Sequence, residues 1–410
     1  MFTLHFPAER GASAVERALY ALNSALVFWF FAFLITGPKQ TLATTALLLL
    51  GLLSLPVTLR MAPRIWAQSA PWLLGLGAYC AFQIVYRLID GGLDARLDPP
   101  ARYLGAIPIL FHLSRFGFGM GALWAGLAAG CVLSGAVGAY EVLIEGLPRA
   151  GAGHHPIAYG SLLALLTVST LHGASLARTT PWRIILGVSA LAGLAGVLLS
   201  GTRGLYLPLL GCIAFIGYRQ LKTCAVPTRK IALAAAASLT LAMVAASQVP
   251  AVQNRFEESK ADYAQISRGN LDNSFGHRLQ MWHAGLFIIS QEPLLGIGPD
   301  VHKRQAFARA FMEENRYGSF VLSQYDHLHN LYINELASFG LVGLVALGGL
   351  LFGALVRTSA PTRDLIVLAL IIILLEGLTE TVLSHHRLAL AFVMLATLAR
   401  AQQVATASQR

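Results

Sequence analysis

Long apolar runs, separated by short clusters of arginine, lysine, proline and glycine, recur along most of this sequence. A helix needs about 20 mainly apolar residues to cross a bilayer core roughly 30 Å thick, and many of the runs approach that length. Membrane-spanning β-strands would show only weak alternation over segments of about ten residues. The pattern therefore predicts a bundle of about a dozen membrane-spanning helices, at residues 18–36, 41–59, 70–88, 101–114, 117–140, 156–177, 183–200, 205–218, 231–247, 329–356, 364–383 and 387–402.

Composition agrees with this prediction. Hydrophobic residues make up 56% of the 410-residue chain and charged residues only 12%, whereas about 25% of a typical soluble chain is charged. We therefore expect an all-α polytopic membrane protein with three regions: residues 1–247 with the first nine spans, a long loop at 248–328, and residues 329–410 with the last three spans. No small-residue cleavage site closely follows the first span, so we expect that span to remain as an anchor.

Basic residues set the expected orientation. With twelve spans both termini lie on one side of the membrane, and most arginines and lysines fall at the termini or in the connections on that side. Short cytoplasmic connections are enriched in basic residues, so the termini are predicted to be cytoplasmic and the 248–328 loop to lie outside. The net charge of +10 is then mostly a topology signal and poor support for nucleic-acid binding. The opposite short connections hold only Lys39, Arg87, Arg96, Arg102, Arg149, Arg203 and Arg387.

The pair His329-Asn330 stands at the predicted start of the tenth span, and Gly340 and Gly343 follow it. An imidazole at the outer mouth of a helix is a candidate general base, because its unperturbed pKa lies near neutral pH. The two glycines would let a neighbouring helix approach closely. From position alone, an interfacial histidine that only hydrogen-bonds to lipid or loop remains an alternative.

Three arginines, Arg149, Arg203 and Arg278, are expected at the same outer face. Arginine is scarce on that side by the orientation rule, so those present need a reason. Bidentate binding of phosphate oxygens is a common one, and a diphosphate-bearing substrate fits this set. The alternative is that each arginine extends to lipid headgroups or pairs with a nearby carboxylate.

Other polar groups could assist or could form a metal site. Asp326 and His327 lie beside His329, but a third ligand with clear spacing is missing, so we expect neither a metal nor a cofactor. Glu335 and Glu376 fall inside predicted spans, where a carboxylate is costly unless it faces a partner or a wet cavity. Either one could orient His329 or an arginine. The pairs His154-His155 and His385-His386 lack companions in sequence and are interpreted as polar interfacial residues.

Together these segments resemble the O-antigen ligase and polymerase superfamily of bacterial envelope glycosyltransferases. The resemblance covers roughly residues 145 to 345 and includes the long outer loop before the histidine. It depends on four motifs: His329-Asn330-x9-Gly340-x-x-Gly343, Thr202-Arg203-Gly204, Arg278-Leu279-Gln280-Met281-Trp282 and Pro293-Leu294-Leu295-Gly296-Ile297-Gly298.

The resemblance implies a GT-C-like glycosyltransferase of the bacterial inner membrane whose active site faces the periplasm. Its donor would be a glycan on undecaprenyl diphosphate, and its acceptor a sugar hydroxyl of the lipid A core in lipopolysaccharide biosynthesis. The reaction would be metal-independent and inverting. His329 would be the base, with Arg203 and Arg278, and Arg149 as a third arginine, binding the diphosphate. Asn330, Glu335 and Asp326 would support them.

Three other functions remain open. A polymerase would join repeat units on the lipid carrier, and a protein O-oligosaccharyltransferase would glycosylate serine in secreted proteins; both use the same donor at the same face. A transporter of lipid-linked glycans belongs to a different class, and intramembrane charges with glycine-interrupted helices also mark transport paths. The absence of detectable repeats argues against a transporter.

Overall fold

The computed structural model describes residues 13–37, 40–91, 98–223, 250–318, 321–322, 325, 327–360 and 362–407. The described residues form helices and no strands, as predicted. The helices up to the loop are α1 (Ala14–Ala32), α2 (Gln40–Thr58), η1 (Leu59–Met61), α3 (Ala62–Gly91), α4 (Asp98–Leu104), α5 (Ala106–Phe116), α6 (Met120–Leu143), α7 (Pro156–Leu176), α8 (Thr180–Leu199), η3 (Arg203–Leu205) and α9 (Tyr206–Thr223). The later ones are α11 (Pro250–Ser267), α12 (Ser274–Gln291), α13 (Val301–Glu314), α15 (Leu331–Gly353), α16 (Thr362–Glu376), η4 (Val382–Ser384) and α17 (His386–Ala407).

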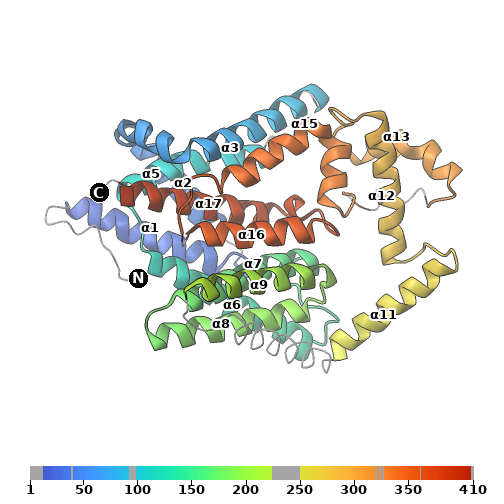
Figure 1. Cartoon of the computed structure of the whole chain (residues 1–410), viewed down its shortest axis with the longest axis horizontal. Coiled ribbons are helices and arrows are strands. Elements are labelled where there is room, and N and C mark those ends of the chain that lie inside the picture. Colours follow the sequence, from blue (N-terminus) through green and yellow to red (C-terminus); the bar gives the residue numbers. More distant parts are fainter. Residues whose placement is uncertain are drawn as a thin grey trace.

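Most of these helices run side by side in one bundle (Figure 1). Within the described residues, seven helical stretches are long and apolar enough to cross a membrane, the longest running through α2 and α3. By length and composition, these helices fit the predicted polytopic membrane protein. α7 is the most buried of them and packs against α6, α8, α9 and α16. Its serines, threonines and glycines are small, which allows the surrounding helices to approach closely.

Two predicted spans differ from the structure, and one cannot be compared. The span expected at 101–114 is divided between α4 and α5 at Gly105; Pro108 in the first turn of α5 has no N–H to continue the helical hydrogen bonds across this point. The span expected at 364–383 ends as a helix at Glu376. The residues that follow are polar and hydrogen-bond outside the helix, as described below. The span expected at 231–247 lies outside the described residues.

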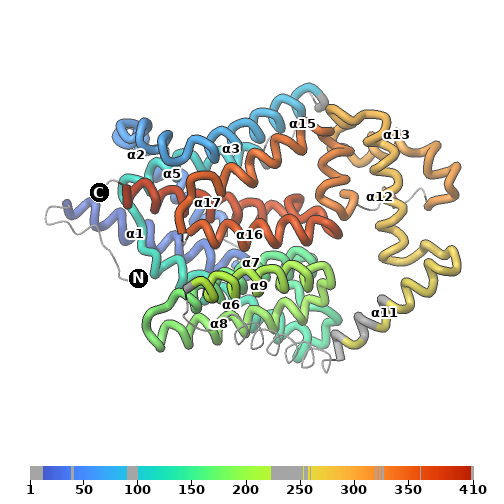
Figure 2. Tube along the Cα trace, viewed as in Figure 1, coloured from blue at the N-terminus to red at the C-terminus, as the bar shows by residue number. Residues whose placement is uncertain are grey.

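The loop expected at 248–328 contains the helices α11, α12 and α13, which gather at one end of the bundle (Figures 1 and 2). We call this the loop end. α12 and α13 share a small apolar core that includes Met281, Ile288 and Met312. α1 begins and α17 ends at the opposite end of the bundle (Figure 1). The loop helices are therefore a structured cap over one end only.

A break in α15 attaches this cap to the bundle. Gly340 has φ 63° and ψ −166° inside the helix, a conformation that is essentially restricted to glycine. The break lets Leu341 and Val342 donate backbone hydrogen bonds to Pro293 and Leu294, at 2.9 and 3.2 Å. From the sequence we expected Gly340 to allow close approach of a neighbouring helix, but a Cβ there would overlap the backbone of Leu294. The glycine therefore accommodates the loop after α12.

Candidate active site

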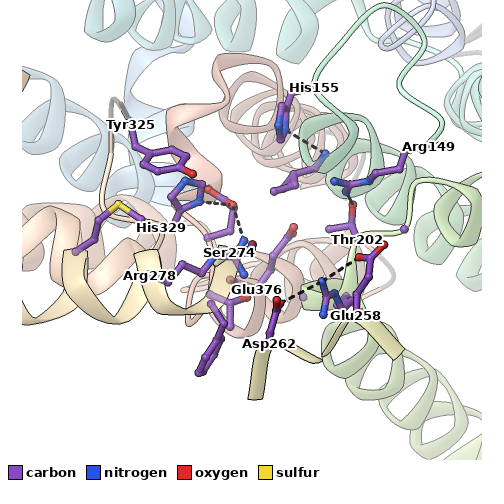
Figure 3. Close-up of a pocket in the computed structure, with 18 of the residues that line it drawn as sticks. Arg149, His155, Thr202, Glu258, Asp262, Ser274, Arg278, Tyr325, His329 and Glu376 are labelled. Carbon is purple, nitrogen blue, oxygen red and sulfur yellow. Dashed lines mark hydrogen bonds and ion pairs between the residues drawn. The ribbon is translucent and has the colours of Figure 1, made fainter. Parts of the chain in front are cut away.

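A cavity of about 800 Å³ lies between the bundle and the loop helices at the loop end (Figure 3). Its walls come from the start of α7, the turn at 200–204, α11, α12, and the segments that precede α15 and follow α16. Four residues singled out in the sequence line it together: His329, Arg149, Arg203 and Arg278. They come from segments up to 180 residues apart, since His329 and Arg149 are separated by that number. The fold therefore gathers the candidate base and all three candidate arginines.

His329 is held by its backbone and by its ring. It adopts φ 46°, an uncommon value for a residue other than glycine, and its carbonyl accepts a hydrogen bond from Trp282 Nε1 at 3.3 Å. Nδ1 lies 2.8 Å from Oε2 of Glu380. Nε2 is buried and has no hydrogen-bond partner among the described residues. If Nδ1 carries the proton toward the carboxylate, Nε2 is a free acceptor, which is the state that a general base requires.

Glu380 is the site residue that sequence reasoning missed. Its Oε1 lies 2.8 Å from Nε2 of His327, and its Oε2 is shared between His329 and Arg278, the latter at 3.8 Å. Burial opposes ionisation of this carboxyl, but the hydrogen bonds from His327 and His329 hold its pKa well below the usual range. The signal was present in the sequence: Gly377, Thr379, Glu380 and Thr381 interrupt an apolar run that we assigned to one continuous helix.

Asn330 begins α15 and connects it to the Glu380 segment. Its side-chain oxygen accepts hydrogen bonds from the backbone of Tyr332 and Ile333, each at 3.0 Å, as an N-cap does. Its amide nitrogen donates to the carbonyl of Leu378 at 2.9 Å. Asn330 thus fixes the distance between His329 and the residue that orients it.

The three arginines have different surroundings. Arg149 donates to the carbonyl of Ser200 at 2.7 Å and so supports the turn before Arg203. Arg203 faces two carboxylates of α11, described below. Arg278 is largely covered, with 25% of its side chain exposed, and burial lowers the pKa of its guanidinium while the negative charge of Glu380 opposes that effect. The cavity is therefore lined by cations of which one, Arg278, sits next to the candidate base.

Neither carboxylate expected from sequence to orient His329 is the one beside it. Glu335 is buried on α15, where Arg87 of α3 is its charged neighbour, and it does not line the cavity. Glu376 lines the cavity, but its Oε1 accepts a hydrogen bond from Ser161 at 2.6 Å. The carboxylate beside His329 is Glu380. Asp326 lies outside the described residues.

The histidines form a larger group than the sequence indicated. The ring of His327 lies 4.6 Å from that of His329 and 6.2 Å from that of His385, and His155 lines the same cavity. His155 and His385, interpreted from sequence as isolated interfacial residues, thus face this group. Ligand atoms of His327, His329 and Glu380 lie within 4.8 Å of one another, so the third metal ligand that seemed missing from the sequence exists in space. The absence of a metal therefore remains a prediction to be tested.

Comparison with known proteins bears on the same part of the chain. A family model described as O-Antigen ligase matches residues 188–348. An uncharacterized protein of Haemophilus influenzae (strain ATCC 51907 / DSM 11121 / KW20 / Rd) is 24% identical over 261 residues, which are 61% of this chain and 63% of that protein. This chain thus spans somewhat less than two thirds of that relative's length. The family match includes Arg203, Arg278, His329 and the break at Gly340. Residues 188–348 are thus similar to the O-antigen ligase family, the family that the sequence motifs predicted.

Proposed function

We propose that this protein is an O-antigen ligase that transfers a glycan from undecaprenyl diphosphate to a sugar hydroxyl of the lipid A core. The observation that carries the proposal is the cavity, where an imidazole nitrogen without a partner and three arginines meet. The family match supports the reaction class. The donor, the acceptor and the residue roles are those that the family resemblance implies, and the chemistry of these groups suits them.

The acceptor and the leaving group of the proposed reaction need different kinds of catalysis. The acceptor hydroxyl is a weak nucleophile, so His329 Nε2 would accept its proton as the oxygen bonds to the anomeric carbon; a positioned base contributes about 10²- to 10⁴-fold. The bond from that carbon to the diphosphate oxygen breaks on the opposite face, which inverts the configuration. The departing diphosphate already forms a stable anion, and Arg203 and Arg278 would neutralise it in place of a metal ion. Glu380 would hold the proton of the neutral His329 ring on Nδ1, leave Nε2 as the acceptor, and stabilise the imidazolium that forms when Nε2 takes the proton.

The orientation of the protein in the membrane is inferred from the position of the termini and from the basic residues. The start of α1 and the end of α17 lie at the end of the bundle opposite the loop helices (Figure 1), and the sequence places most basic connections with the termini. We infer about a dozen spans in the bacterial inner membrane, with the termini in the cytoplasm and the cavity open to the periplasm.

Reconstitution with defined substrates tests the proposal. The purified protein in liposomes would receive undecaprenyl-diphosphate glycan and, separately, lipid A core, a serine-containing acceptor protein, or no second acceptor. Glycan on the lipid A core with inverted linkage supports the ligase. Carrier-linked chains that lengthen would indicate a polymerase, and glycosylated protein an oligosaccharyltransferase. Donor that crosses the bilayer without transfer would indicate a transporter.

A chelator arm tests the metal prediction. Because His327, His329 and Glu380 could bind an ion, the assay would be repeated after extensive EDTA treatment. Unchanged transfer is expected from a site that relies on arginine for charge neutralisation. Loss of transfer that Zn²⁺ or Mg²⁺ restores would contradict the metal-independent mechanism.

A further inference from the structure

The helix α11 presents two carboxylates to the arginine that the proposed reaction assigns to the diphosphate. Glu258 Oε2 lies 3.6 Å from Nη2 of Arg203, and Asp262 Oδ2 lies 4.0 Å from the same atom. Both residues line the cavity together with Ala261. Residues three and four apart share one face of a helix, so this face of α11 is turned toward the cavity. Figure 3 shows Glu258 and Asp262 directed at one guanidinium group.

These contacts are suited to being broken. Both distances exceed that of a hydrogen bond, and the exposed fraction of the side chain is 50% for Glu258, 36% for Arg203 and 20% for Asp262. Exposed ion pairs of this kind contribute little to stability. A diphosphate, in contrast, offers an arginine several charged oxygens in a geometry that permits paired hydrogen bonds.

The surroundings of Arg278 differ in this respect. Its carboxylate partner, Glu380, is only 3% exposed and is held by two histidines. Glu380 therefore cannot leave without breaking those bonds, whereas the α11 carboxylates meet Arg203 at distances longer than a hydrogen bond, and half of the Glu258 side chain is exposed. The cavity thus has one fixed cationic position and one that a movable anionic group occupies.

We propose that Glu258 and Asp262 act as internal competitors of the diphosphate: they occupy Arg203 in the empty enzyme, leave it when the donor binds, and return to promote release of undecaprenyl diphosphate after transfer. This inference rests on the proposed function, since it takes the donor's diphosphate as the competing group. It gives α11 a role in substrate turnover that is separate from the chemical step.

The test is the affinity of the purified protein for undecaprenyl diphosphate, measured at low ionic strength in detergent micelles. The double variant Glu258→Gln/Asp262→Asn should bind this probe about 3- to 10-fold more tightly than the wild type, because two competing charges next to Arg203 are removed. In the transfer assay, inhibition by added undecaprenyl diphosphate should become stronger, so that KM for the donor and kcat fall together.

A neighbouring acid on the same helix provides the matched control. Glu257 is paired with Lys260 at 2.8 Å and does not line the cavity, so Glu257→Gln removes one negative charge from α11 without changing the contacts of Arg203. Its affinity for the probe should equal that of the wild type, whereas Glu258→Gln alone should already bind more tightly.

The outcomes separate this inference from the proposed function. Wild-type protein that binds the probe and transfers glycan, with a double variant that binds no tighter or more weakly, overturns the competitor role alone. Equal effects of Glu257→Gln and Glu258→Gln would reduce the role to a general effect of charge and also overturn it. Wild-type protein that does not bind undecaprenyl diphosphate at all would remove the proposed donor and the inference with it.

Discussion

Arginines at the two ends of the bundle have different kinds of partner. At the end opposite the loops, Arg400 is fully buried and donates hydrogen bonds to the carbonyls of Gln68, Gly353, Ala354 and Val356. At the loop end, Arg278 faces the carboxylate of Glu380 at 3.8 Å and an open cavity.

This difference distinguishes structural charge from functional charge. A buried cation needs partners, and backbone carbonyls at helix ends are permanent ones. Arg400 therefore closes the ends of neighbouring helices. Arg278 keeps capacity to bind an anion that arrives from outside, and His329 keeps an unpartnered nitrogen. Paired substitutions at matched residues can separate the two roles.

The largest effect is expected at Gly340 of α15, with Gly348 of the same helix as its control. Gly340→Ala forces an alanine into a conformation open almost only to glycine and against the backbone of Leu294, at a cost of about 3 kcal/mol or more. Little folded protein should be recovered in size-exclusion chromatography. Gly348, farther along the same helix, has open space where a Cβ would project, and Gly348→Ala should be within about 1 kcal/mol of the wild type. Equal recovery of both variants would contradict the role given to the break.

The next largest effect is expected at Glu380, with the buried carboxylate of Asp364 as its control. Glu380→Gln removes the anion that orients His329, so transfer per folded molecule should fall about 100-fold. Asp364 is also buried and pairs with Arg219 at 2.9 Å, but far from the cavity. Asp364→Asn should lower the melting temperature and leave the transfer rate of the folded protein near that of the wild type. The comparison fails if both variants lose transfer to the same extent.

The sequence predicted which helices form and which residues line the site better than it predicted the contacts between those residues. The bounds of α2, α6 and α7 lie within a few residues of the predicted spans, because a long apolar run leaves one choice. The grouping of Arg203, Arg278 and His329 followed from the orientation rule and the family motifs. The role of Glu380 could not be read this way, because its partner His329 is 51 residues away along the chain.

Tertiary hydrogen bonds explain the other differences. An apolar helix would normally continue through Gly340, and only the backbone of the loop after α12 makes the break favourable. In the sequence, the competing acids Glu258 and Asp262 are only part of a charged stretch. Their contact with Arg203 could not be predicted, because Arg203 precedes them by more than 50 residues. Periodicity reports which face of a helix is buried, but not which distant residue it meets.

A smaller but sharper contrast comes from the same substitution at two arginines. Arg278→Lys keeps the charge but loses the planar fork, so KM for the donor should rise about 10-fold or more while the melting temperature stays unchanged. Arg400→Lys cannot reach all four carbonyls, and should destabilise the protein by about 2 kcal/mol with normal KM in what remains folded. Thermal unfolding of both variants measures the change in stability, and donor titration measures the change in KM. A stability loss confined to Arg278→Lys would reverse the assignment.

The smallest effect is expected at Arg149, whose Nε is already used by the carbonyl of Ser200. Arg149→Lys should lower transfer about 3-fold, because the turn before Arg203 loses one hydrogen bond. Arg115, paired with Glu16 at 2.6 Å on the exposed surface of the opposite end, provides the control, and Arg115→Lys should have no effect. A loss at Arg149 as large as that at Arg278 would indicate that Arg149 binds the diphosphate directly.

The most direct test measures donor binding and glycan transfer on one variant, His329→Ala, with His302→Ala on the exposed face of α13 as control. If His329 activates the acceptor and the arginines bind the diphosphate, His329→Ala should bind the undecaprenyl-diphosphate glycan within about 3-fold of the wild type and transfer it at least about 10²-fold more slowly. Transfer at the wild-type rate, or donor binding lost along with transfer, would contradict this division of roles.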